Sequence, residues 1–129
     1  MHKVLVVDDE ADARRVLVMV LEQAGAVVGA ASSVREAIAA LPAVRPDVLV
    51  SDLGLPDGSG LEIMRRLRQP RAGATVPVGI ALTGYGMEED VARSRDAGFA
   101  VHITKPVNFD RLQEAIERAT SRATEAAQA

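Results

Sequence analysis

Two stretches of this sequence, residues 4–7 and 48–50, are continuously apolar and valine-rich, and each is followed within one residue by aspartate. A strand with one face in water alternates apolar and polar side chains, so an unbroken apolar run predicts a strand buried on both faces. Strands of this kind occur in parallel sheets that carry helices on both sides. Asp8 and Asp52 therefore follow buried strands directly, and a charge at such a place needs a function or a partner.

Three further strand-forming runs, at residues 27–31, 77–82 and 99–104, are separated by stretches with apolar residues at helical spacing. Strands that alternate with helices through short connections predict a parallel sheet covered by helices on both faces. We expect a single α/β domain over residues 1–120. Residues 121–129 carry no apolar face and are expected to be a helix end, a tail or a linker remnant.

Capping residues predict several helix boundaries. Ser33 and Ser59 each stand three residues before a glutamate, which is the S-x-x-E pattern of a capping box. Asn108 is a candidate cap for the last helix. Pro42 and Pro46 are expected to end the second helix, because proline removes a backbone donor and clashes with the preceding turn.

Composition excludes several classes of protein. There are 15 Lys and Arg against 18 Asp and Glu, and the basic residues are scattered, so we expect no direct binding to nucleic acid. The chain has no cysteine, which excludes disulfides and thiolate metal sites. Its apolar runs are too short to insert in a membrane, and a strand pattern from the first residues leaves no room for a signal sequence. We expect a cytoplasmic protein.

The ends of the predicted strands carry the polar residues of interest. Asp8 and Asp9 follow the first strand, Asp52 the third, Thr83 the fourth and Lys105 the fifth. In an open parallel sheet the binding crevice lies outside the carboxyl ends of the strands. We therefore expect these five residues, which are far apart in the sequence, to meet there.

The chemistry of this set favours phosphoryl transfer. Three aspartates in one crevice repel one another unless a cation lies among them or one of them is protonated. Carboxylate oxygens without nearby His or Cys favour Mg2+ over Zn2+. Lys105 can supply positive charge and Thr83 a hydrogen bond to a phosphoryl group. An aspartate can itself be the nucleophile and form an aspartyl phosphate.

Four motifs, in this order, resemble those of receiver domains of two-component response regulators, and the resemblance covers nearly the whole chain. They are Val6-Val7-Asp8-Asp9-Glu10, Ser51-Asp52-Leu53-Gly54-Leu55-Pro56 with Gly58 and Gly60, Ala81-Leu82-Thr83-Gly84-Tyr85-Gly86, and Lys105-Pro106. The resemblance implies a (βα)5 doubly wound, flavodoxin-like parallel sheet of five strands in the order 2-1-3-4-5.

The resemblance also implies roles for the acidic residues. Asp52 would accept a phosphoryl group from the phosphohistidine of a histidine kinase or of a histidine phosphotransfer domain. Mg2+ would be bound by Asp9, Asp52 and the Gly54 carbonyl, with Asp8 acting through water. The protein would be a signalling phosphoacceptor that assists its own Mg2+-dependent phosphorylation and dephosphorylation, rather than an enzyme acting on other substrates.

By the same resemblance, Thr83 and Lys105 would bind the phosphoryl group, and the peptide bond between Lys105 and Pro106 would be cis. Phosphorylation would repack the surface of the fourth helix, fifth strand and fifth helix. Tyr85, with Gly54, would tune the lifetime of the phosphoryl group. His102 stands where the family usually has Tyr or Phe. It is either a space-filling residue or a switch whose protonation biases two conformers near neutral pH.

Two of the motifs, Asp-Leu-Gly-Leu-Pro and Leu-Thr-Gly-Tyr-Gly, resemble receivers attached to hybrid sensor kinases more than those of DNA-binding regulators. The chain is therefore either a fragment of a hybrid kinase, fused to its kinase core, or a free single-domain regulator, and the sequence does not decide between them.

Other functions fit the residues less well. An FMN carrier of the same fold needs a Ser- and Thr-rich phosphate loop after the first strand, where this chain has three acids. A phosphatase of the dehalogenase type would carry a D-x-D nucleophile there, whereas these acids are adjacent. A phosphorylation-independent pseudo-receiver, acting only as a binding module, would be expected to lack one of Asp9, Asp52, Thr83 or Lys105.

Overall fold

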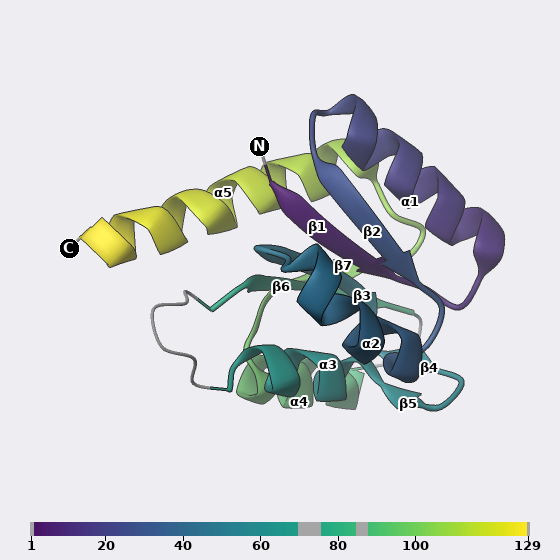
Figure 1. Ribbon diagram of the computed structural model, residues 1–129. Helices are drawn as coiled ribbons and strands as arrows, with labels where there is room; N and C mark the ends of the chain where they lie inside the picture. Colours follow the sequence, from purple (N-terminus) through teal and green to yellow (C-terminus); the bar gives the residue numbers. More distant parts are fainter. Residues whose placement is uncertain (1, 70–75, 85–87, 129) are drawn as a thin grey trace.

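The structure is a computed structural model that describes residues 2–69, 76–84 and 88–128. Within these residues, helices and strands alternate along the chain (Figure 1). In order they are β1 (Lys3–Val7), α1 (Ala11–Gln23), β2 (Val27–Ala31), α2 (Val34–Val44), β3 (Val48–Asp52), β4 (Gly54–Leu55), β5 (Gly58–Ser59), α3 (Gly60–Leu67), β6 (Val78–Thr83), α4 (Glu88–Ala97), β7 (Phe99–Thr104) and α5 (Phe109–Gln128).

Five strands form one parallel sheet in the order β2-β1-β3-β6-β7. Because β6 and β7 are the fourth and fifth strands of this sheet, the order is the predicted 2-1-3-4-5, and the predicted fold class is confirmed. The chain runs outward from β1 to β2 and then returns across β1 to β3. The carboxyl ends of β1 and β3 thus flank the point where the strand order reverses, which is where ligands bind in open sheets.

Two apolar layers cover the two faces of the sheet, as the unbroken apolar runs predict. In β1, Val4 and Val6 pack with α1 and α5, whereas Leu5 and Val7 pack with α2 and α3. All four side chains are fully buried. Figure 1 shows the same division, with α1 and α5 on one side of the sheet and α2, α3 and α4 on the other. The resulting rigid sheet fixes the strand ends that carry the polar residues.

The second helix ends later than expected. Pro42 lies inside α2, so the prediction that it ends this helix was wrong. A proline near the end of a helix forfeits one hydrogen bond, and the Arg45 N–H still donates to the Leu41 carbonyl at 2.9 Å beyond it. Arg45 then adopts a left-handed conformation with φ 47°, and Pro46 follows it. The helix therefore ends at Val44.

The predicted caps are present at the starts of α2, α3 and α5. The Ser33 hydroxyl accepts from the Glu36 N–H, the Asn108 side chain accepts from the Arg111 N–H, and Ser59 forms a full capping box at α3. Where the sequence predicted only a loop after Asp52, β4 and β5 pair as a short antiparallel hairpin.

The last helix, α5, continues to Gln128, so residues 121–128 belong to its end. The domain boundary at residue 120 stays a prediction. Among the residues described, no helix combines the length and apolar composition needed to cross a lipid bilayer.

Candidate functional site

Three aspartates meet at the carboxyl ends of β1 and β3. Asp8 and Asp9 directly follow β1, and Asp52 is the last residue of β3. One carboxylate oxygen from each of the three lies within 4.8 Å of the others. Asp8 is fully buried and Asp52 is 5% exposed, whereas Asp9 is open to solvent. The predicted acidic crevice is thus formed, with its two inner carboxylates almost out of contact with water.

Asp8 is held through both its backbone and its side chain. Its N–H donates to the Ala31 carbonyl at 3.1 Å, and its Oδ1 accepts from the Glu10 N–H at 2.9 Å. Its carbonyl accepts from Arg14 Nη1, also at 2.9 Å. Glu10 is the N-cap residue of α1, so the start of this helix orients the Asp8 carboxylate. The contact with Arg14 was missed from the sequence, because Arg14 matched no motif.

Lys105 brings a cation to the two buried carboxylates. Its Nζ lies 2.8 Å from Asp52 Oδ1 and 3.3 Å from Asp8 Oδ2. The Lys105 N–H donates to the Thr83 carbonyl at 2.7 Å, which ties the residue after β7 to the end of β6. The Lys105–Pro106 bond is cis, as the resemblance implied.

These contacts shift the pKa values of the site. The pKa of Asp52 is raised from 3.8 to about 7, mainly because burial disfavours the ionised carboxylate. The hydrogen bond from Lys105 lowers this pKa, and the neighbouring Asp8 raises it further. Burial alone would lower the pKa of Lys105, but its bonds to Asp52 and Asp8 outweigh burial and raise it. Three carboxylates share the crevice with the single Lys105 ammonium, and a further cation would reduce the repulsion between them.

The three aspartates fit Mg2+ on chemical grounds. They offer hard carboxylate oxygens, and among the described residues no histidine or cysteine belongs to this cluster of possible metal ligands. Asp9, on the open side, leaves room for the waters that Mg2+ retains. Gly54, predicted to contribute its carbonyl, is the first residue of β4 and is exposed, with open space where a side chain would begin.

The other predicted residues lie around this crevice. Thr83 is the last residue of β6 and is 4% exposed, one position beyond the residue that pairs with Asp52. Tyr85 lies outside the described residues. His102 lies in β7 and is half-buried.

His102 has a partner that the sequence did not indicate. Its Nε2 is hydrogen-bonded to the hydroxyl of Ser94, a fully buried residue of α4. The Ser94 hydroxyl also lies 2.7 Å from the Val91 carbonyl; when it donates to that carbonyl, its oxygen can accept from Nε2. Burial, and secondarily the charge of Arg95, lowers the pKa of His102 below 6.5. The shift favours the neutral ring, and a role of His102 protonation in biasing two conformers stays a prediction.

Comparison with known sequences identifies the family. The sequence model of the response regulator receiver domain matches residues 4–117. This chain belongs to that family. The receiver domain is a signalling domain, the phosphoacceptor module of two-component systems.

Curated relatives of the receiver domain include regulators of several kinds. This chain is 38% identical to the KDP operon transcriptional regulatory protein KdpE of Escherichia coli, over 95% of this chain and 52% of that protein. It is 40% identical to the DNA-binding transcriptional activator DevR/DosR of Mycobacterium tuberculosis, over 91% of this chain and 54% of that protein. An uncharacterised 14.6 kDa protein of Leptolyngbya boryana is 42% identical, over 81% and 79% of the two chains. The chain thus spans about half the length of the two transcriptional regulators.

Solved structures of whole receiver domains have the same fold. A response regulator receiver domain protein from Clostridium thermocellum matches with a TM-score of 0.86 and 28% identity, over 98% of this chain and 99% of that one. A CheY-like receiver domain protein from Methanospirillum hungatei matches with a TM-score of 0.87 and 28% identity, over 98% of each chain.

Proposed function

We propose that Asp52 is the phosphoacceptor of this receiver domain, and that Mg2+ is required for its phosphorylation. The observation that carries the proposal is the set of groups around Asp52: ligand oxygens of Asp8 and Asp9 lie within 4.8 Å of its carboxylate, and the Lys105 ammonium lies 2.8 Å from its Oδ1. A nucleophilic carboxylate needs cationic groups nearby when it approaches a phosphoryl group, because both carry negative charge. Asp9 and Asp52 would hold the metal together with the Gly54 carbonyl, and Asp8 would act through water.

In the proposed reaction, one ionised carboxylate oxygen of Asp52 attacks phosphorus, and the bond from phosphorus to the histidine nitrogen of the donor breaks. Lys105 lies 2.8 Å from that carboxylate and would move with the phosphoryl group, to which it can donate hydrogen bonds. Mg2+, when bound, offsets the charge of the carboxylates and of the phosphoryl oxygens. The Thr83 hydroxyl would donate to a phosphoryl oxygen.

The partner that delivers the phosphoryl group is proposed to be a histidine kinase or a histidine phosphotransfer domain, in the cytoplasm where such donors act. A hollow of about 450 Å³ lies beside the crevice, between α1 and the segment after β7. It is lined mainly by apolar atoms, including those of Val16, Val107 and Phe109, and it reaches Asp8 and Lys105. An apolar rim of this kind next to a charged centre would allow a partner helix to pack while its histidine approaches Asp52.

The proposed response to phosphorylation is a repacking of the surface formed by α4, β7 and α5. Thr83 and Lys105 would turn toward the new phosphoryl oxygens, and the His102–Ser94 bond between β7 and α4 would change with them. Gly54 and Tyr85 are proposed to tune access of the water that hydrolyses the acyl phosphate.

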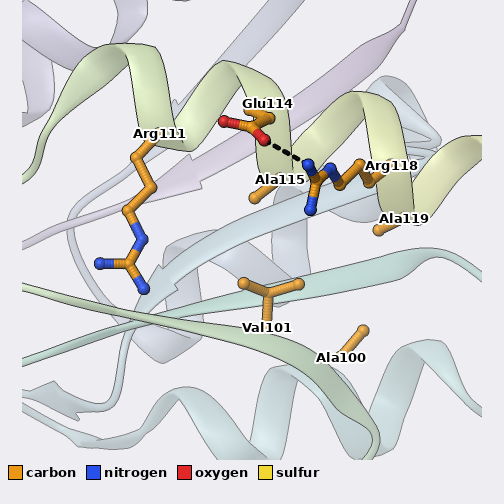
Figure 2. A pocket seen from close by; sticks show the side chains of 7 residues that line it. All are labelled: Ala100, Val101, Arg111, Glu114, Ala115, Arg118 and Ala119. Atoms are coloured by element: carbon orange, nitrogen blue, oxygen red, sulfur yellow. Dashed lines mark ion pairs between the residues drawn. The ribbon is translucent and has the colours of Figure 1, made fainter.

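Part of this surface is a shallow hollow of about 370 Å³ between β7 and α5 (Figure 2). Glu114 and Arg118 form an ion pair of 2.7 Å along α5, and Arg111 points away from that pair. Ala100 and Val101 of β7 form its apolar floor. We propose that this surface transmits the phosphorylation signal, either to a domain fused to the receiver, such as a kinase core, or to a separate partner protein.

The test is phosphorylation with a small-molecule donor such as acetyl phosphate in the presence of MgCl2. The wild type should gain the mass of one phosphoryl group, and hydroxylamine, which cleaves acyl phosphates, should remove it. Asp52→Asn should gain none, whereas the matched control Asp110→Asn, which alters an exposed acid in the first turn of α5, should be labelled like the wild type. Full labelling of Asp52→Asn would refute the assignment. An unlabelled wild type would instead favour the phosphorylation-independent binding module.

A further inference from the structure

The loop between Asp52 and α3 is fixed firmly at its base. The Leu53 N–H donates to the Leu82 carbonyl at 3.4 Å, and the Leu53 carbonyl accepts from the Gly60 N–H at 3.0 Å. Gly60 packs so closely on the Asp52 carbonyl that a Cβ there would lie 2.3 Å from its oxygen. Leu53 at the start of the loop, and Gly60 where the loop joins α3, therefore have little freedom.

The tip of the same loop is tied to a different helix. Between β4 and β5, the Asp57 carboxylate accepts from the Val34 N–H at 2.8 Å through Oδ1 and from the Arg35 N–H at 3.0 Å through Oδ2. These two amides begin α2 and have no acceptor within the helix. Asp57 thus uses both carboxylate oxygens to join the loop after Asp52 to α2, 22 residues earlier in the chain.

Gly54 lies between these two attachments. It has no side chain, its surroundings are open, and its β4–β5 hairpin pairs only two residues from each arm. A hairpin of this size is marginally stable without further contacts. The position of the Gly54 carbonyl thus depends on what restrains the hairpin at its tip.

We propose that Asp57 is a positioning residue for metal binding: by fastening the hairpin to the start of α2, it holds the Gly54 carbonyl where Mg2+ can bind it. The proposal rests on the function proposed above for Asp52 and Gly54. Mg2+ requires nearly ideal octahedral geometry, so a ligand that moves by a fraction of an ångström loses much of its contribution. The anchor itself is a property of the metal-free protein.

The same two hydrogen bonds hold the pKa of Asp57 below its usual range, because they favour the ionised carboxylate. An asparagine at this position has a single acceptor oxygen and can keep only one of the two bonds. Asp57→Asn should therefore have an effect between those of the wild type and Asp57→Ala.

The experiment is isothermal titration of metal-free protein with MgCl2, for the wild type, Asp57→Ala, Asp57→Asn and Ser33→Ala. The last variant is the matched control, because it removes the other cap of α2, at the Glu36 N–H, without touching the hairpin. We expect affinity to fall about tenfold in Asp57→Ala, as for residues that orient metal ligands, and less in Asp57→Asn. Ser33→Ala should bind within about twofold of the wild type.

A second readout needs no metal. Amide hydrogen exchange across the β4–β5 hairpin should be faster in Asp57→Ala than in the wild type, and unchanged in Ser33→Ala. Wild-type affinity in Asp57→Ala, an equal loss in Ser33→Ala, or unchanged exchange in the hairpin would each overturn the positioning role and leave the proposed function of Asp52 intact. A wild type that binds no Mg2+ would overturn both.

Discussion

Replacing Asp52 by asparagine should make the metal-free protein more stable at neutral pH, although it removes the residue on which signalling would depend. Asp52 is 5% exposed and lies beside the fully buried Asp8. Asparagine has nearly the same size, carries no charge, and retains an acceptor oxygen for the Lys105 ammonium. The substitution therefore removes the electrostatic cost of the acidic crevice and leaves its packing in place.

The sign and the size follow from the pKa of Asp52, which is about 7 in the folded state against an ordinary value of 3.8. Below pH 3.8 the carboxyl is protonated in both states, and it contributes its full stability. Between 3.8 and about 7 the unfolded chain ionises first, so the wild type loses stability as the pH rises. Each pKa unit is worth about 1.4 kcal/mol, which gives an upper limit of about 4 kcal/mol. Because the exposed Asp9 leaves one side of the crevice facing solvent, and asparagine bonds Lys105 less strongly, we expect about 1–2 kcal/mol.

The assay is urea unfolding followed by circular dichroism in the presence of EDTA, at several values between pH 4 and pH 8. The free-energy difference between Asp52→Asn and the wild type should be near zero at about pH 4 and should grow to about 1–2 kcal/mol in favour of the variant at pH 8. Adding MgCl2 should stabilise the wild type preferentially, since the metal would bind only its folded form. Asp110→Asn, at an exposed position, should show no comparable gain. An Asp52→Asn protein less stable than the wild type at pH 8 would refute the reasoning.

Two further predictions follow from Lys105 and His102. Lys105→Met leaves the carboxylates of Asp52 and Asp8 without their cation. Labelling by acetyl phosphate should therefore fall at least about tenfold. Mg2+ affinity, measured by calorimetric titration, should stay equal or rise, because the competing positive charge of the lysine is gone. A fall in Mg2+ affinity would contradict that division of roles. The imidazole of His102 should titrate below pH 6.5 by NMR, and its contribution to stability should be fully present above 6.5 and lost as the pH falls through its folded-state pKa. His102→Gln keeps a hydrogen-bond donor for Ser94 but cannot be protonated, so it should not lose stability in this way as the pH falls. A His102 ring that titrates at or above pH 6.5 would show that burial does not lower its pKa.

Much of the fold could be predicted because its signals are local. The strands at residues 27–31 and 99–104 have the predicted bounds, and the caps at Ser33, Ser59 and Asn108 are present because each needs only neighbours in the sequence. Pro42 was the exception. Its local rule predicts a helix end, but α2 continues for two more residues, because the turn that follows Pro42 still closes with its own hydrogen bond.

The candidate site was predicted in outline for a different reason. A parallel sheet brings the carboxyl ends of its strands to one edge, so the identity of Asp8, Asp9, Asp52 and Lys105 as crevice residues followed from the order of the strands. Motif resemblance then supplied the expected chemistry. Neither route could give the balance of charge, since a pKa depends on burial and on distances of a few ångströms.

By itself, the sequence determined which segments form strands and helices, and which residues stand at the strand ends. Only the tertiary structure decided how those residues interact: Lys105 lies within 2.8 Å of Asp52, Asp57 reaches back to the start of α2, and Ser94 meets His102 across two elements. These contacts join residues that are 8 to 53 positions apart. Side-chain partners at such separations depend on how helices and strands pack together, and no pattern of neighbouring residues records that packing.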